Sequence, residues 1–181
     1  MEKVERHNFV KFPYRRQERD SGDINNGGID LVTEPERINE IHEVESFPWL
    51  KKLLILVNSK DGVFMTLGCV AGHLDNHFCG YIDFTVRPQA SQKFRENLIN
   101  LDEMFYAYLQ KAMPEEETRT RALEYARSIL HWTLSPLEIQ GECYSKVNVS
   151  FDALQEEGVI WAIDHLEFFL VNEYPLLPHS G

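Results

Sequence analysis

The sequence predicts a single α+β domain in which helices pack on a mainly antiparallel sheet. Two segments, 78–86 and 143–151, alternate apolar and polar residues, as strands with one buried side do. Two others, 91–113 and 114–133, repeat apolar residues at helical spacing. The length of 181 residues fits one domain, and a hydrophobic content of 43% suffices for a packed core.

The N-terminal 28 residues differ from the rest of the chain in charge and in turn content. Residues 1–22 carry a formal charge of +2, and the remaining 159 carry −13. Small, turn-forming residues follow at 21–23 and 25–28, and they predict a mobile Gly-rich loop. This loop lacks the terminal Lys-Ser/Thr of a phosphate-binding loop. We therefore divide the chain into a basic segment with its loop, 1–28, and an α+β domain, 29–181.

The domain is expected to begin with a short helix. In the motif 33–36, Thr33 can cap the first amides, Glu36 can reach back, and proline suits the first turn. Ile38 and Ile41 would lie on one side of that helix. The apolar run Leu50–Val57 is either a buried strand or a short core helix, because periodicity does not separate the two over so few residues.

A β-hairpin is predicted next, with strands at 63–70 and 78–86 and a turn at 72–76. The second strand alternates cleanly and ends at Pro88. Ile82, Phe84 and Val86 point to one side, and Tyr81, Asp83 and Thr85 point to the other. We expect the second side to be solvated or to face a ligand.

Two helices in an antiparallel hairpin are expected after this. Ser91 can cap a helix that runs to Met113, and Pro114 with three glutamates suits the start of a second helix. The inner stripe of the second helix would include Leu123, Ala126 and Leu130. The motif Ser135-Pro136-Leu137-Glu138 resembles a capping box and predicts one further helical turn, which Gly141 ends.

The C-terminal part is predicted to contain a strand and a last helix. The strand covers 143–151, and the helix runs from Asp152 to about Asn172. Gly158 weakens this helix by about 1 kcal/mol relative to alanine, so 159–163 could instead be a strand. The tail 174–178 is expected to be irregular.

Composition restricts the partners and the compartment. A net charge of −11 disfavours a general nucleic-acid binder and docking on an anionic membrane, and it suits a basic protein partner. The three cysteines form no CxxC pair, which favours a reducing compartment. The N-terminal residues contain no apolar run of a signal peptide. We therefore expect a cytoplasmic protein; the oligomeric state is left open.

A group of metal-ligating residues lies in the predicted hairpin. His73, His77 and Cys79 are joined there by Asp75, and all are residue types that bind zinc. The motif lacks the glutamate of HExxH, and a turn explains the same residues. The chain contains none of the catalytic serine or kinase motifs, so we expect no catalytic residues, no bound metal and no cofactor.

The acidic C-terminal third contains most of the functional signal. Residues 133–181 contain eight Asp and Glu and one cation, Lys146, for a charge of −7. Such a surface can serve solubility alone, or it can steer a basic partner. The candidate partner-binding residues are Tyr81, Asp83, Thr85, Tyr144, Asp152, Glu156, Glu157, Asp164 and Glu167.

The organisation of the chain resembles that of bacterial toxin-immunity proteins, in particular those of contact-dependent growth inhibition. The hairpin GVFMTLGCVAGHLDNHFCGYIDFTVRP at 62–88, the helix pair and the strand CYSKVNVSF at 143–151 carry this resemblance. It covers residues from about 30 to 173 and rests on organisation, with no diagnostic motif. No individual site residue is carried over from the family.

The resemblance implies a non-catalytic inhibitor of a cognate toxin domain, often a basic nuclease. An acidic surface would mimic the phosphate charge that the toxin expects, or a sheet edge at 63–70 or 78–86 would accept a toxin strand. Two other functions stay open. One is a small cytosolic metal-dependent hydrolase that uses the His73, His77 and Cys79 region, and the other is a scaffold or regulator without a toxin.

Overall fold

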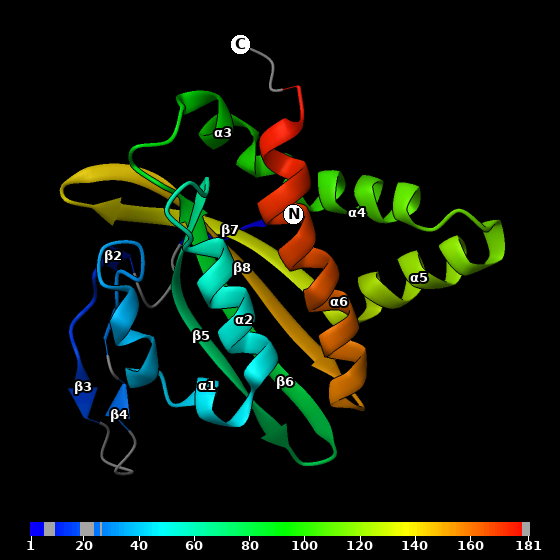
Figure 1. Cartoon of the computed structure of the whole chain (residues 1–181), viewed down its shortest axis with the longest axis horizontal. Helices are drawn as coiled ribbons and strands as arrows, with labels where there is room; N and C mark the ends of the chain where they lie inside the picture. Colours follow the sequence, from blue (N-terminus) through cyan, green and yellow to red (C-terminus); the bar gives the residue numbers. More distant parts are fainter. Residues whose placement is uncertain (6–9, 19–23, 26, 179–181) are drawn as a thin grey trace.

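The computed structural model describes residues 1–5, 10–18, 24–25 and 27–178, and it has the predicted α+β fold in a single domain. Four long strands form the centre of the sheet, in the order β7-β8-β6-β5 (Figure 1). They are β5 (Phe64–Leu74), β6 (His77–Val86), β7 (Leu130–Ile139) and β8 (Glu142–Ala153). All three pairings between them are antiparallel, as the sequence predicts.

The N-terminal residues extend this sheet beyond β7. Strands β1 (Glu2–Lys3) and β2 (Lys11–Phe12) both pair with β7 in the parallel direction. A separate two-stranded sheet joins β3 (Gln17–Glu18) to β4 (Ile24–Asn25). Most of the predicted Gly-rich loop, residues 21–23 and 26, lies outside the described residues. The basic segment is thus attached to the edge of the domain that β7 would otherwise form.

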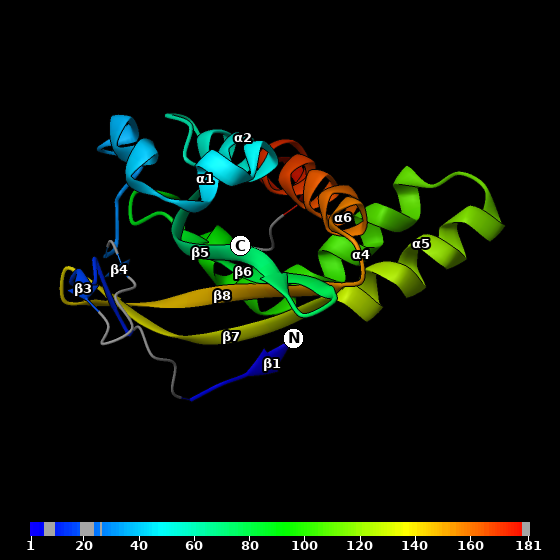
Figure 2. The same ribbon diagram turned by 90° about the horizontal axis from the view of Figure 1, so that it is seen from below.

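The helices gather on one side of the sheet, as Figure 2 shows. They are α1 (Glu43–Ser46), α2 (Pro48–Val57), α3 (Gln92–Glu96), α4 (Leu101–Ala112), α5 (Glu116–Ile129) and α6 (Glu156–Phe168). Helices α2 and α6 pack against each other, and α4 packs against α5 in the predicted antiparallel hairpin. Within the described ranges no helix is both long and apolar enough to cross a membrane.

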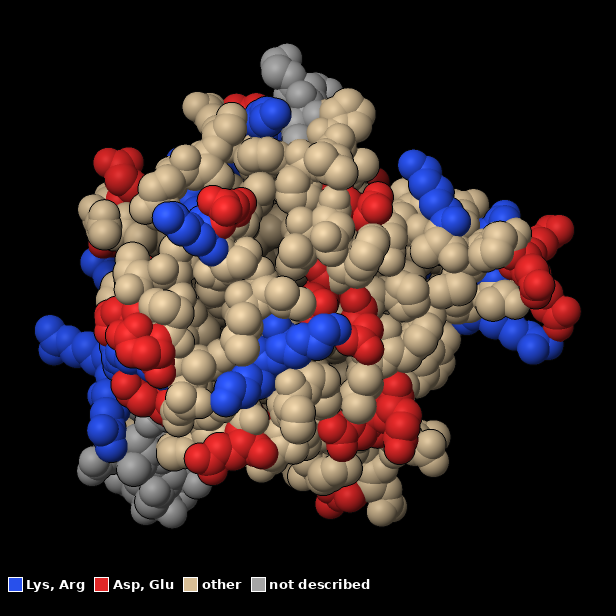
Figure 3. All heavy atoms as spheres, viewed as in Figure 1, with Lys and Arg blue, Asp and Glu red and all other residues tan. Residues whose placement is uncertain are grey.

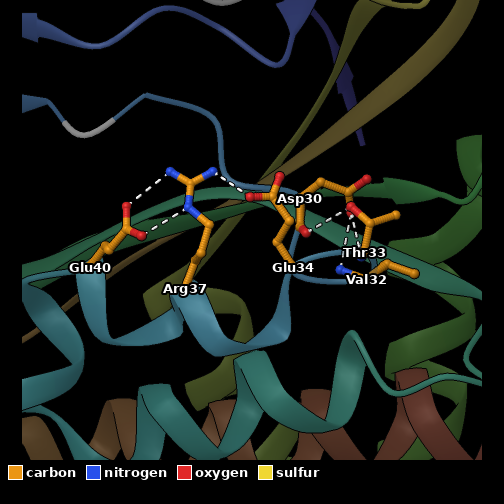
Figure 4. A network of polar contacts seen from close by, with 6 residues as sticks. All are labelled: Asp30, Val32, Thr33, Glu34, Arg37 and Glu40. Carbon is orange, nitrogen blue, oxygen red and sulfur yellow. Dashed lines mark hydrogen bonds and ion pairs between the residues drawn. The ribbon is translucent and has the colours of Figure 1, made fainter.

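The first predicted helix is replaced by two short ones. A 3₁₀ helix, Pro35–Glu40, precedes α1, and its N-cap residue is Glu34, not Thr33. Thr33 instead belongs to a turn in which the Asp30 carboxylate accepts the Val32 amide at 3.0 Å (Figure 4). The apolar run 50–57, for which strand and helix both stayed open, is a core helix, since it forms most of α2.

The helix predicted at 91–113 is interrupted. The structure has α3, then a 3₁₀ turn at Asn97–Asn100, and then α4. Ser91 stands at the N-cap position, but its side chain makes no capping hydrogen bond. The apolar spacing is nevertheless correct, because Leu98, Leu101 and Phe105 are all buried.

The prediction of a helix end and a helical turn at 130–138 is wrong, because these residues form β7. Leu130 and His131 were placed at the end of the second helix, and both belong to the strand. The alternation of buried Leu130 and Trp132 with exposed His131 is that of a strand. Pro136 is tolerated because β7 lies near the edge of the sheet, where a missing amide donor costs little.

The last helix is shorter than predicted, and the alternative strand at 159–163 is excluded. Helix α6 continues as a π-helical turn, Phe169–Glu173, and a 3₁₀ turn, Tyr174–Leu176. Gly158 is explained by close packing: an added Cβ atom would lie 1.7 Å from the Tyr125 hydroxyl. The tail at 174–178 thus begins with a regular turn.

Each side of the sheet has its own apolar cluster. The large cluster lies between the sheet and the helices and includes Phe78, Ile82, Phe84 and Val149. The small cluster lies on the other side of the sheet. There the N-terminal arm, by which we mean the described residues 1–5 and 10–18, covers part of the sheet. It consists of Phe12, Met65, Leu67, Leu137 and Ile139.

Two buried polar side chains attach the C-terminal end of α2 to the sheet. The Arg87 guanidinium donates hydrogen bonds to the carbonyl oxygens of Val57, Ser59, Lys60 and Phe64, at 2.6–3.1 Å. Asn58 accepts the Thr66 amide at 3.0 Å and donates to the Leu54 carbonyl at 2.7 Å. Because the last carbonyls of a helix have no partners within it, these contacts satisfy groups that burial would otherwise leave unpaired.

We predict that Arg87→Met lowers the free energy of unfolding by about 3 kcal/mol or more, because several buried carbonyls lose their donors at once. The same change at the exposed Arg121 should alter stability by less than about 0.5 kcal/mol. Urea denaturation of both variants measures the difference. Equal stability of the two would show that the Arg87 contacts contribute little.

Candidate functional site

The nine candidate residues fall into two regions of the structure. Tyr81, Asp83, Thr85 and Tyr144 lie on the side of the sheet opposite the helices, as their alternation predicts. The five carboxylates lie at the end of β8 and along α6. The two regions meet where Asp152 on β8 pairs with Cys79 on β6.

The expected exposure of the polar side is not found at Asp83 and Thr85. Asp83 accepts hydrogen bonds from Lys146 Nζ at 3.1 Å and from Asn148 Nδ2 at 2.7 Å. All three residues are buried, and Lys146 is only 1% exposed. Thr85 is buried as well and donates to the Ser145 carbonyl at 2.7 Å. Asp83 and Thr85 therefore offer no surface to a partner in this structure.

The two tyrosines have different surroundings. Tyr144 is partly buried beside the small apolar cluster, and the Arg95 guanidinium lies 4.9 Å from the centre of its ring. Tyr81 is also half-buried and lines a groove in the sheet. Tyr14, from the N-terminal arm, lies close to this part of the sheet, and burial raises the pKa of its hydroxyl above the usual value.

The groove is an open hollow of about 470 Å³ over the end of the sheet, next to the C-terminal end of α5. It combines groups of different chemistry, and the residues with polar or reactive side chains in its lining are Cys79, Tyr81, Arg127, Ser128, His131, Ser150 and Asp152. Its one arginine lies over the Tyr106 ring, 4.9 Å from the ring centre. His131 Nε2 lies 3.4 Å from a Glu2 carboxylate oxygen at the sheet edge.

The proposed metal ligands are divided between the two sides of the sheet. The His73 ring packs against Phe78 of the large core, with 5.0 Å between ring centres. His77 is on the opposite side, where its Nδ1 contacts the Asp152 carboxylate. Among the described residues, no three His, Cys, Asp or Glu side chains are placed to hold one metal ion. Asp75 instead forms the hairpin turn with a φ of 53°, a role the sequence allowed.

The acids along α6 are not equivalent. Lys52 of α2 pairs with Asp164 at 3.2 Å and with Glu167 at 3.1 Å, and Glu167 is buried. Glu156 accepts a hydrogen bond from the Trp49 indole at 2.9 Å. Glu157 is exposed one residue later, at the start of the helix. The carboxylates in the second half of α6 are therefore partly neutralised, and those of its first turn keep their negative charge.

Arg37 neutralises acids in a different region, beside the first 3₁₀ helix. Its guanidinium bonds to the Glu34 carboxylate at 2.8 Å and to both oxygens of Glu40 at 2.9 Å (Figure 4). These glutamates thus contribute little net charge to the surface.

One end of the molecule, which is the lower end in Figure 1, contains acids that form no ion pair with an arginine or lysine among the described residues. The hairpin tip, α1 and the start of α6 meet there, and we call this surface the acidic end. Its carboxylates are Glu43, Glu45, Asp75, Asp152, Glu156 and Glu157. Figure 3 shows acidic groups over this end, and above them the blue side chains of basic residues cross the surface.

Two leucines at the acidic end were missed by the sequence analysis. Leu74, at the end of β5, is 66% exposed, and Leu154, after β8, is 73% exposed. Both lie in segments that were read as turn or helix start. For Leu74, the signal available in the sequence was an apolar residue between the polar neighbours His73 and Asp75 in a predicted turn.

Comparison with known proteins adds no homologue. The chain matches no protein-family model, and it has no significant match to a curated protein or to a solved structure. The functional argument therefore rests on the residues of this chain.

We predict that Lys146→Met lowers the free energy of unfolding by about 3–5 kcal/mol, because it leaves the Asp83 carboxylate buried without its cation. The double variant with Asp83→Asn removes both charges and keeps an acceptor for Asn148. It should recover at least half of that loss in chemical denaturation. A double variant less stable than Lys146→Met alone would contradict this account.

Proposed function

We propose that this protein is a cytoplasmic immunity protein that binds a cognate bacterial toxin domain and blocks its active site or substrate groove. One observation carries the proposal. The C-terminal third contains a single lysine and no arginine, and that lysine is buried against Asp83. The surface contributed by residues 133–178 is therefore acidic without an exposed Lys or Arg of its own.

Such a surface is suited to a basic partner. A nuclease attracts phosphate groups with lysine and arginine side chains, and carboxylates on an inhibitor can occupy the same field. The six carboxylates of the acidic end extend from the hairpin tip to the first turn of α6. Complementary charge accelerates encounter and selects the partner, and packing then determines how long the complex lasts.

A non-catalytic mode of action agrees with the chemistry of the described side chains. Inhibition of this kind requires a stable surface, and it makes no demand on a nucleophile or a proton donor. Asp83, Lys146 and Arg87, the buried ionisable groups that bond across the sheet, hold strands and helix together. The alternative of a hydrolase at His73, His77 and Cys79 is not favoured by any specific contact, since His73 packs on the far side of the sheet.

The direct test is neutralisation of a candidate toxin domain, sought in the genes that neighbour the one for this chain. We expect co-expression to restore growth of cells that produce that domain, and we expect the two purified proteins to form a stable complex. A catalytically inactive toxin variant serves as bait, so that binding is measured separately from rescue. Absence of both binding and rescue at low salt would refute the proposal.

Association with the toxin should slow as the ionic strength rises. Between about 0.01 and 0.15 M the Debye length falls from about 30 to about 8 Å, so long-range attraction by the acidic surface is largely screened. Stopped-flow measurement of the association rate at several salt concentrations tests this. An association rate that does not change with salt would exclude electrostatic steering as the mechanism, while neutralisation could still occur.

A further inference from the structure

The two exposed leucines of the acidic end lie at the ends of β5 and β8, the two strands that flank β6. Leu74 on β5 is the register partner of His77 on β6. Phe78, the next residue of β6, is the partner of Ala153 on β8, and Leu154 follows Ala153 directly in the chain. Neighbouring strands are about 4.8 Å apart, so β5 and β8, which end next to the two leucines, lie about 10 Å apart on either side of β6.

Exposure of this degree is unusual for large apolar side chains in the described chain. Leu74 is 66% exposed and Leu154 is 73% exposed, and Val70 on the same strand as Leu74 is 43% exposed. Successive side chains of a strand point to opposite sides of the sheet. Val70 and Leu74 are four residues apart, so they point to the same side. Together the three form an apolar strip at the end of the sheet, next to the groove that Tyr81 and Asp152 line.

Carboxylates border this strip. Asp75 follows Leu74 directly, Asp152 precedes Leu154 by two residues, and Glu157 follows Leu154 by three, in the first turn of α6. Among the described residues, His77 contacts this border, with its Nδ1 against the Asp152 carboxylate. The lysines of the adjacent helix are engaged with other groups, since Lys51 donates to Asn39 and Lys52 pairs with Asp164.

We infer that this strip is the centre of the toxin interface, with Leu74 and Leu154 as its anchors. The occupant is a basic surface of the toxin domain that presents apolar depressions for the two leucines and lysine or arginine side chains for Asp75, Asp152 and Glu157. This inference rests on the proposed function and adds the location and the chemistry of the contact.

The arrangement matches the anatomy of specific protein interfaces. Binding energy concentrates in a few apolar side chains at the centre of an interface, and polar groups around them exclude water and orient the partner. The anchors and the border should therefore affect different rate constants. Loss of a leucine removes apolar burial and speeds dissociation, and loss of a border charge slows association.

The test of the anchors compares matched leucine variants. Leu74→Ser and Leu154→Ser should each weaken binding of the inactive toxin domain about tenfold or more, mainly through faster dissociation. Leu176→Ser is the control, because Leu176 is 83% exposed and belongs to the 3₁₀ turn Tyr174–Leu176, which comes after the C-terminal end of α6. It should change the dissociation constant less than about twofold. Circular dichroism melting of all three variants confirms that they are folded.

The test of the border uses two variants of equal net charge. Asp75→Asn with Glu157→Gln neutralises two border carboxylates, and asparagine tolerates the left-handed backbone of position 75. Glu103→Gln with Glu142→Gln neutralises two exposed carboxylates elsewhere. The first pair should slow association at low salt at least about threefold more than the second.

The outcomes separate the two proposals. If the wild-type chain binds the toxin and the Leu74 and Leu154 variants bind equally well, the interface lies elsewhere and the proposed function stands. If both charge pairs slow association equally, the border has no special part and this inference is overturned in that respect. If the wild-type chain does not bind the toxin at all, both proposals fail.

Discussion

Lys146 and Asp83 face each other from neighbouring central strands, and the rest of the structure is built around their ion pair. Asp83 is opposite Asn148 in the β6–β8 register, and Lys146 lies diagonally from it on the same side of the sheet. Because both charges are buried, each strongly penalises any register that would separate it from its partner. The pair also removes the C-terminal third's one lysine from the surface, so the same contact that aligns the strands leaves that surface acidic.

On the side of the sheet that the helices leave uncovered, the ion pair lies between a covered part and an open part. Towards one end, Phe12 and Tyr14 of the N-terminal arm cover it, together with Met65 and Leu137. Towards the other end the sheet stays open, and the groove, the apolar strip and the acidic end follow one another there. A partner that approaches this open half meets a rigid surface, since every strand beneath it is fixed by pairing on both sides or by packing against α1 and α2.

The sequence predicts well those elements whose burial follows a simple period. Alternation at 78–86 and 143–151 identifies β6 and β8 and the side to which each residue points, because a strand repeats every two residues. The alternation does not show that the polar sides of these two strands are neighbours in the sheet. Asp83 was therefore expected at the surface. Strand β7 was missed because Ser135-Pro136 imitates a helix start, and its pairing with β8 and the arm overrides that local signal. Leu74 and Leu154 lie where the two-residue alternation of the strands ends. The exposure of their side chains there depends on the tertiary structure and does not follow from the sequence pattern.

The two lateral edges of the sheet are protected by different means, and this bears on self-association. Unpaired edge strands are templates for joining other chains into aggregates. Along β7, the amide of Glu138 already donates to Val10 and that of Val4 donates to Leu134, so the arm occupies part of the edge. Along the first half of β5, Asn58 and Arg87 bond to the backbone of Thr66 and Phe64 and occupy hydrogen-bonding groups there. The arm on one side and these two side chains on the other thus shorten the stretches of sheet edge at which copies of this chain could pair.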